Sequence, residues 1–215
     1  MKSRLSVEDL KRMFIYVAQQ VIDHEKYLTT IDKRIGDGDH GTNMALGFKE
    51  VRRKLESEEQ KNVNEVFRCV GMTLLDTMGG ASGVLFGTVF ISGIVGLEPQ
   101  NEIDLATFAQ IFQSSLAALK KRGKAKLGDK TMIDAFEPAT FALLEAAGKG
   151  LNFVDAINLA AEKSREGMEK TKQYVAKFGR AKSYGEAGIG HADAGAVSVS
   201  LIFQAIALWI RENIQ

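Results

Sequence analysis

The sequence predicts an all-α fold, and three observations support this prediction. Only two prolines occur among 215 residues, so long helices can run without interruption. Apolar residues recur at steps of three and four along nearly the whole chain, which is the spacing of one buried helical face. Between these segments no run alternates apolar and polar residues as a half-buried strand would. We therefore expect eight helices in an up-and-down barrel or bundle, forming a single domain over residues 1–215.

The first four helices are predicted from their apolar spacing. The segment Ser6–Asp9 resembles a capping box with Asp in place of the preferred Glu, and it starts a helix that runs to about Thr30. Its apolar positions are Val7, Leu10, Phe14, Val17, Val21 and Leu28. The second and third helices follow from the series Met44, Phe48, Val51, Leu55 and the series Val66, Val70, Leu74. The fourth begins after "MGGASG", residues 78–83.

The last four helices are predicted over residues 104–121, 131–147, 152–178 and 194–213. Gly123, Gly148 and Gly179 follow the first three of them, and glycine is the common residue just past the end of a helix.

Composition limits the partners and the compartment. With 28 basic and 27 acidic residues the net charge is +1, so no global field attracts nucleic acid or an anionic membrane. One cysteine, Cys69, cannot form an internal disulfide and fits a reducing compartment. The N-terminus lacks the apolar core of a secretory signal. The longest apolar run, residues 84–97, is too short to cross a bilayer. We expect a cytoplasmic protein with neither nucleic acid nor membrane as a partner.

Four of the connections between helices are unusually rich in Gly, Asp, Ser and Lys. They read "IDKRIGDGDHG", "MGGASG", "RGKAKLGDKT" and "GRAKSYGEAGIGHADAG", and the last is far longer than an ordinary helix–helix turn. In an up-and-down bundle alternate connections lie at the same end. These four therefore meet at one end, beside the N-termini of every second helix.

That end is predicted to gather side chains suited to a nucleotide and a metal ion. They are Asp32, Asp37, Asp39, Ser82, Lys130, Arg180, His191 and Asp193. Helix N-termini carry unpaired N–H groups that suit phosphate oxygens, and carboxylates suit a hard cation such as Mg²⁺. For Asp37 and Asp39 the alternative is a solvated turn at a helix start.

Familiar nucleotide and calcium motifs are absent. The segment "GKAKLGDKT" carries an extra Asp129 compared with a P-loop, and no strand precedes it. The last loop lacks a dinucleotide fingerprint in register. The segment after Gly36 departs from an EF-hand, because Phe48 would occupy its twelfth position.

The four loops, in this order, resemble the L-subunit family of bacterial dihydroxyacetone kinases over nearly the whole chain. The resemblance rests on "GDGDHGTNM", "GMTLLDTMGGASGVLFGTVF", "RGKAKLGDKTMIDA" and "GRAKSYGEAGIGHADAGA". It implies an all-α barrel with ADP or ATP and two Mg²⁺ ions at one end. The metal ligands implied are Asp32, Asp37 and Asp39. The nucleotide-binding residues implied are His40, Gly41, Thr42, Asn43, Ala81, Ser82, Gly123, Met132, Arg180, Asp193, Ala194 and Gly195.

The resemblance also implies a reaction and partners. Arg180 matches a phosphate-facing arginine and is the predicted catalytic residue. The sugar, dihydroxyacetone or a related short ketose, is held by a separate K-type subunit. In one branch of the family bound ADP is recharged by a phosphohistidine donor protein of the phosphotransferase system, and this branch is favoured for a short L chain with His40 after Asp39. In the other branch ATP exchanges as a substrate, for a sugar such as erythrulose.

Two further classes of function remain open. The chain is alternatively a nucleotide-binding regulator that contacts a transcription factor, or a structural helical module, which leaves the aspartates without a role. Ala194 stands where the family usually has proline, which leaves the sugar less certain. His24 is interpreted as a surface or cap residue, and Lys130 either meets phosphate or caps a carboxylate.

Overall fold

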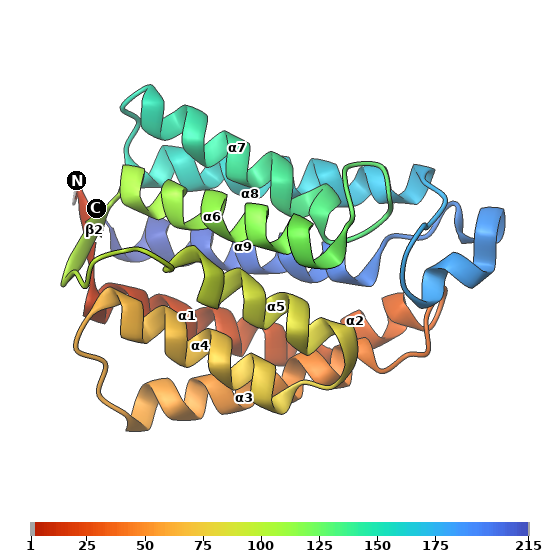
Figure 1. The fold of residues 1–215 in the computed structure, drawn as a ribbon, viewed down its shortest axis with the longest axis horizontal. Coiled ribbons are helices and arrows are strands. Elements are labelled where there is room, and N and C mark those ends of the chain that lie inside the picture. Colours follow the sequence, from red (N-terminus) through yellow and green to blue (C-terminus); the bar gives the residue numbers. More distant parts are fainter. Residues whose placement is uncertain (1–2, 215) are drawn as a thin grey trace.

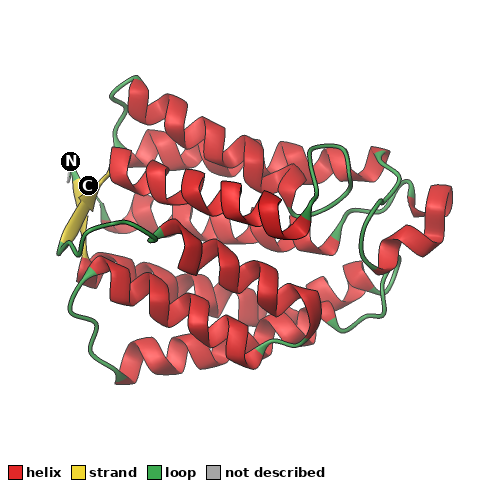
Figure 2. Cartoon of the chain, in the orientation of Figure 1, coloured by secondary structure: helices red, strands yellow, loops and turns green. Residues whose placement is uncertain are grey.

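The computed structural model describes residues 3–214, and helices that run alongside one another make up most of them (Figure 1). They are α1 (Val7–Asp23), α2 (Glu25–Asp32), α3 (His40–Ser57), α4 (Val63–Thr77), α5 (Gly80–Gly93), α6 (Leu105–Gly123), α7 (Ile133–Gly148), α8 (Phe153–Lys170) and α9 (Ala194–Asn213). Two 3-10 helices, η1 (Thr171–Gln173) and η2 (Arg180–Gly188), lie between α8 and α9. Figure 2 shows how little strand accompanies them, and the predicted all-α class is confirmed.

The direction of the chain reverses from one long helix to the next. The connections α2–α3, α4–α5, α6–α7 and α8–α9 all lie at the end away from the chain termini (Figure 1). This is the arrangement that the up-and-down prediction requires, and it brings the four glycine-rich loops together.

The first predicted helix is two helices, because the chain breaks at His24 (φ −96°, ψ 11°). The backbone N–H of His24 donates to the carbonyl oxygens of Gln20 and Val21. Its ring Nδ1 lies 2.7 Å from the Gln20 carbonyl oxygen. The residue therefore caps α1, which confirms its interpretation as a cap histidine, whereas the prediction of one continuous helix was wrong.

The helix predicted over residues 152–178 ends at Lys170 instead. Tyr174 is extended, and the N–H of Lys177 donates to the carbonyl of Asp129, 3.1 Å away, rather than to a helical partner. The helical spacing of apolar residues continues in the sequence after Lys170, but the chain there contacts the α6–α7 loop and does not continue the helix. The predicted start of α5 was also wrong. This helix begins at Gly80, inside the glycine-rich segment 78–83 and not after it.

A short antiparallel pair of strands also departs from the prediction. Strand β1 (Arg4–Ser6) pairs with β2 (Glu102–Asp104), and the fully buried Leu5 lies opposite Ile103. Ser6 and Asp104 then cap α1 and α6 with their side chains. Strands of three residues are too short to show an alternating pattern, which is why the sequence did not predict them.

Helix α9 lies in the core and contacts α1, α7 and α8. Its Phe203 ring packs 5.4 Å from that of Phe112 and 6.0 Å from that of Phe136, measured between centroids. Within residues 3–214 it is the one helix long and apolar enough to cross a membrane, and 67% of its apolar stretch is buried inside the bundle. Its composition is therefore that of a core helix.

Glycine at position 167 lets α8 approach α7 closely at the site end. A Cβ there would lie 2.0 Å from the carbonyl oxygen of Asp134. The Asp134 carboxylate in turn accepts hydrogen bonds from the N–H groups of Gly128 and Thr131, at 2.6 and 2.8 Å. The close contact of two helices therefore fixes the α6–α7 loop.

Replacing Gly167 by Ala is expected to destabilise the fold by about 1–3 kcal/mol, because the methyl group overpacks the contact. The matched control is Gly148→Ala at the end of α7, where a Cβ meets no atom within 4 Å. That control should be neutral or stabilising by a few tenths of a kcal/mol. Urea unfolding of both variants measures the difference, and equal stabilities would contradict the packing argument.

Candidate functional site

A cleft of about 900 Å³ opens at the end of the bundle where the four glycine-rich loops meet. Residues at or beside the N-termini of α3, α5, α7 and α9 line it. Each such terminus presents N–H groups without helical partners and partial positive charge. The cleft therefore favours an anion at several places at once.

Three carboxylates stand on one side of this cleft. Asp32 ends α2, and Asp37 and Asp39 follow it on the loop before α3. One ligand atom from each lies within 4.8 Å of the others. Burial and the adjacent Asp37 carboxylate raise the pKa of Asp39. The negative charges of the clustered carboxylates therefore repel one another.

The loop geometry holds the carboxylates together. The Asp32 carboxylate oxygen Oδ2 accepts hydrogen bonds from the N–H groups of Gly38 and His40, at 2.8 and 3.3 Å. A Cβ at Gly36 would lie 2.1 Å from Asp32 Oδ1, so only glycine fits there. A set made only of carboxylate oxygens, close together and partly exposed, is the donor chemistry that Mg²⁺ prefers. The residues present therefore fit a magnesium ion.

The start of α5 forms a bare backbone surface on the cleft. No side chain caps its first N–H groups, and a Cβ on Gly79 or Gly80 would meet nothing within 4 Å. Gly80 has φ +65°, a conformation that favours glycine. Because no side chain intervenes, a phosphate oxygen can approach these N–H groups closely.

His40 links this turn to the core helix. Its Nδ1 lies 3.4 Å from Ser82 Oγ and its Nε2 lies 2.7 Å from Ser198 Oγ on α9. Burial lowers the pKa of the His40 imidazole, which keeps the ring neutral near pH 7. The ring therefore orients Ser82 without adding charge to the cleft.

Helix α9 begins at Ala194, and the carboxylate of Asp193 caps it by accepting a hydrogen bond from the Ala196 N–H at 2.8 Å. The helix start is thus formed without a proline at position 194. Burial raises the pKa of Asp193 to about 7, and the nearby carboxylate of Asp134 adds to the shift.

Arg180 lines the cleft beside the carboxylates. It starts η2, and its Nε lies 3.1 Å from Asp37 Oδ2. The Arg180 side chain is 80% exposed, so the pair contributes little to stability and leaves the guanidinium free to meet another anion.

The remaining wall of the cleft is mostly apolar. Gly123, Met132, Leu85 and Phe178 line it. Arg122, also at the wall, donates from Nη1 to Thr88 Oγ1 at 3.0 Å. Such a surface can hold the flat face of a base.

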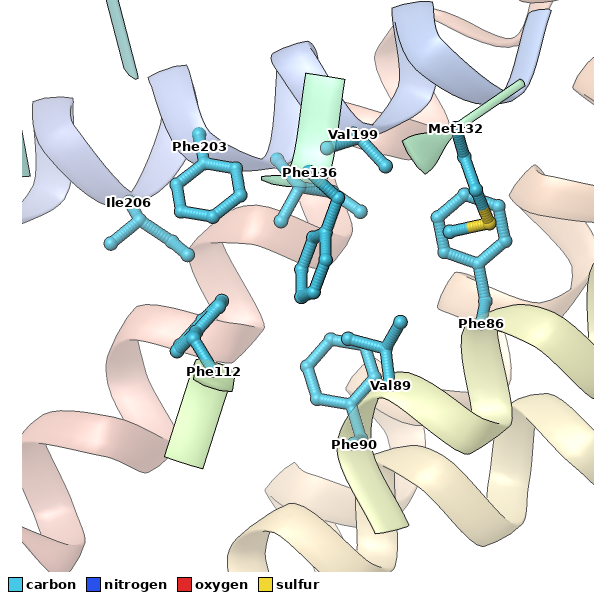
Figure 3. A pocket seen from close by; sticks show the side chains of 10 residues that line it. Phe86, Val89, Phe90, Phe112, Met132, Phe136, Val199, Phe203 and Ile206 are labelled. Atoms are coloured by element: carbon cyan, nitrogen blue, oxygen red, sulfur yellow. The ribbon is translucent and has the colours of Figure 1, made fainter. Parts of the chain in front are cut away.

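A second, much smaller cavity lies behind this wall in the core (Figure 3). It has about 20 Å³ of free volume and only apolar lining, and it shares Phe86 and Met132 with the cleft. An apolar space of this size is a packing gap rather than a water site.

Most of the predicted site residues meet at the cleft. Those lining it are Asp32, Asp37, Asp39, His40, Asn43, Ala81, Ser82, Gly123, Met132, Arg180, Asp193, Ala194 and Gly195. Gly41 and Thr42 do not line it. Gly41 is buried where a Cβ would meet Thr29 Oγ1 at 2.2 Å, and Thr42 is exposed. His191 also lies outside the lining.

Lys130 also lines the cleft, with the carboxylates of Asp193 and Asp134 nearby, but its hydrogen bonds go to backbone carbonyl groups. Its side chain is only 1% exposed, and its Nζ donates to the carbonyl oxygens of Thr171 and His191. Sequence reasoning missed Arg122, Thr131, Leu85 and Phe178 as cleft residues. Thr131 and Arg122 bound the third glycine-rich loop, so that loop was a usable signal, whereas nothing in the pattern singled out Leu85.

Fold and cleft together define an all-helical protein with an open site suited to a polyanion and a hard cation. The sequence profile of the DAK2 domain matches residues 34–208. The chain therefore belongs to the DAK2 domain family.

Named relatives agree with this membership. The chain is 38% identical to the PEP-dependent dihydroxyacetone kinase, ADP-binding subunit DhaL, of Escherichia coli K12, covering 87% of this chain and 89% of the relative. It is 32% identical to the PTS-dependent dihydroxyacetone kinase, ADP-binding subunit DhaL, of Lactococcus lactis, covering 87% and 90%.

A solved structure is also similar. The dihydroxyacetone kinase of C. freundii in complex with AMP-PNP and Mg²⁺ superposes with a TM-score of 0.73 at 28% identity. The match covers 93% of this chain and 33% of that one, so this chain spans about a third of its length. The resemblance drawn from the four loops is confirmed.

The pKa of Asp193 predicts how stability depends on pH in the nucleotide-free protein. A carboxyl with a pKa near 7 when folded and about 4 when unfolded binds its proton more tightly in the folded state. Between pH 4 and 7 the wild type should therefore lose stability relative to Asp193→Asn as pH rises, by at most about 1.4 kcal/mol per pH unit. Asparagine keeps the helix cap. Thermal unfolding across this range measures the trend, and the opposite slope would show that Asp193 is ionised in the fold.

Proposed function

We propose that this chain is the ADP/ATP- and Mg²⁺-binding subunit of a dihydroxyacetone or related short-ketose kinase. It passes a phosphoryl group from bound nucleotide to a sugar held by a separate K-type subunit. The observation that carries this proposal is the cleft, in which three clustered carboxylates face four helix N-termini and Arg180. The names of the DhaL relatives and of the complex with AMP-PNP and Mg²⁺ support it.

In this proposal Asp32, Asp37 and Asp39 hold two Mg²⁺ ions. These ions supply charge neutralisation for the phosphates. The carboxylates repel one another without a cation, and this repulsion favours metal binding. A cation at Asp37 would compete with Arg180 for this carboxylate and would leave the guanidinium free to meet a phosphate.

The nucleotide is proposed to lie across the cleft. Its phosphates meet the bare N-terminus of α5 at Ala81 and Ser82, the segment 40–43 and the start of α9 at Asp193–Gly195. Its base and ribose rest against Gly123 and Met132. Within the segment 40–43, His40 and Asn43 line the cleft and make the proposed contacts, whereas Gly41 and Thr42 do not line it.

Arg180 is the proposed catalytic residue. A guanidinium close to the transferred phosphoryl group stabilises the charge that its oxygens carry in the transition state. This chain therefore supplies electrophilic activation, and the acceptor hydroxyl and any base that acts on it come from the partner subunit.

The phosphoryl donor is proposed to be a phosphohistidine protein of the phosphotransferase system, which recharges ADP that stays bound. The words "PEP-dependent" and "PTS-dependent" in the names of the relatives favour this branch over free ATP. We also propose that the chain acts in the cytoplasm and forms a single nucleotide-binding domain.

Replacing Asp37 by Asn is expected to weaken Mg²⁺-dependent ADP binding by at least about tenfold, because a charged ligand is lost. Asp76→Asn is the matched control, since Asp76 is an exposed carboxylate near the same end that does not line the cleft. Calorimetry with and without Mg²⁺ measures both variants. Unchanged affinity in Asp37→Asn would remove the metal site from the proposal.

The chain alone is expected to phosphorylate no sugar, because the acceptor is held by another polypeptide. The purified chain is mixed with ATP, Mg²⁺ and dihydroxyacetone, then with a K-type subunit, and finally with the phosphohistidine donor system in place of ATP. Sugar phosphate formed before the K-type subunit is added would overturn the two-chain reaction. Product with the donor system but not with ATP supports the phosphotransferase branch. No product in any mixture would instead favour a nucleotide-binding regulator.

A further inference from the structure

The segment 171–193 forms an arm that leaves the end of α8, carries Arg180 over the cleft, and returns to α9. Its two ends are tied together. The N–H of Gly190 donates to the Lys172 carbonyl at 2.7 Å, and the N–H of Asp193 donates to Thr171 Oγ1 at 3.0 Å. The arm is thus a closed loop with its own neck, and its tip carries the guanidinium.

The buried ammonium group of Lys130 is bonded to both sides of this neck. Lys130 Nζ donates to the Thr171 carbonyl at 2.7 Å and to the His191 carbonyl at 2.5 Å. The first carbonyl belongs to the segment that leaves α8, and the second belongs to the segment that returns to α9. Because the side chain is 1% exposed, water competes little for these bonds.

Asp129, the residue before Lys130, also contacts the arm, at a point closer to Arg180 in the sequence. The carbonyl of Asp129 accepts from the Lys177 N–H at 3.1 Å, and its carboxylate oxygen Oδ1 lies 2.9 Å from Lys177 Nζ. Although burial opposes ionisation, the Lys177 ammonium and the Lys126 N–H keep the pKa of Asp129 below its usual value. Lys177 precedes Arg180 by three positions, so this contact restricts the part of the arm that carries the guanidinium.

Holding Lys130 in this place is energetically costly. Its backbone is in the left-handed region (φ +60°), which disfavours residues other than glycine. Its charge is buried, and burial lowers the pKa of the ammonium. The nearby carboxylates of Asp193 and Asp134 compensate part of this cost. An apolar residue would fill the same space but could not bond two carbonyl groups of the arm.

We propose that Asp129 and Lys130 are positioning residues that hold the arm so that Arg180 faces the transferred phosphoryl group. They act through Arg180 and touch no phosphate themselves. This proposal rests on the proposed kinase function, in which Arg180 is catalytic. Holding of the arm can be measured without that activity.

The first measurement is hydrogen exchange over peptides from residues 171–193. Lys130→Met removes the two hydrogen bonds from its ammonium to the neck. Lys177→Met removes the side-chain contact with Asp129 at an exposed position, with little risk to folding. Both variants should raise exchange in the arm by about tenfold or more while α1, α3 and α4 keep wild-type protection. The matched control is Lys124→Met, which removes the same charge from an exposed, left-handed position of the same loop and should change nothing.

The second measurement is a double-mutant cycle with Arg180→Ala in the reconstituted phosphotransfer assay. Arg180→Ala and Lys130→Met should each lower kcat by about tenfold or more, and Lys177→Met by about threefold. In the Arg180→Ala background the further loss from Lys130→Met or Lys177→Met should shrink to less than about twofold. ADP affinity in Lys177→Met should stay within about twofold of wild type, because the guanidinium acts on the transferred group.

The outcomes separate the proposals. Losses that multiply fully in the double variants would show a merely structural role and overturn the positioning proposal. Wild-type exchange in the arm of both variants would overturn it as well. If the wild type gives no turnover with a K-type subunit, the proposed function fails, and the exchange result alone decides whether Asp129 and Lys130 hold the arm.

Discussion

Antiparallel packing of successive helices is the constraint on which the site depends. When each helix reverses the direction of the one before it, alternate loops must meet at one end, and the N-termini of α3, α5, α7 and α9 meet there too. A cleft with four partly positive helix ends then follows from topology, before any side chain is chosen. The glycine-rich loops add access to the backbone, and the aspartates add the opposite charge.

The balance between these charges determines which ligands suit the cleft. Carboxylates at Asp32, Asp37 and Asp39 lie close enough to repel, while Arg180 and backbone N–H groups offset part of that repulsion. None of these partners is sufficient to neutralise three acidic groups in a partly exposed cluster. The charges of the cleft therefore suit a ligand that brings both positive and negative charge, as a metal-bound phosphate does.

Much of this arrangement could be predicted from the sequence, because the signals were local. Helical spacing predicted most of the long helices, and the loop before α3 predicted the carboxylates. The glycine-rich segment 78–83 predicted a backbone open to phosphate, although α5 starts inside this segment and not after it. The break at His24 and the early end of α8 could not be predicted, since helical spacing continues through both. In α8 the deciding bond joins Lys177 to Asp129, two residues far apart in the chain. The role of Lys130 was missed for the same reason, because its partners are backbone carbonyls that no residue type reveals.

The packing of α1 against α9 has a consequence for how the protein reaches its native state. These helices lie near opposite ends of the described chain yet share the core, so their contact closes a very long loop and carries a large entropic cost. Contacts of that kind generally form late and slow the folding reaction. Since Asp193 and the start of α9 belong to the cleft, we expect ligand competence to emerge with the final collapse of the bundle and not in an earlier intermediate. Ligand binding should consequently return at the same rate as the native fold, in one kinetic phase.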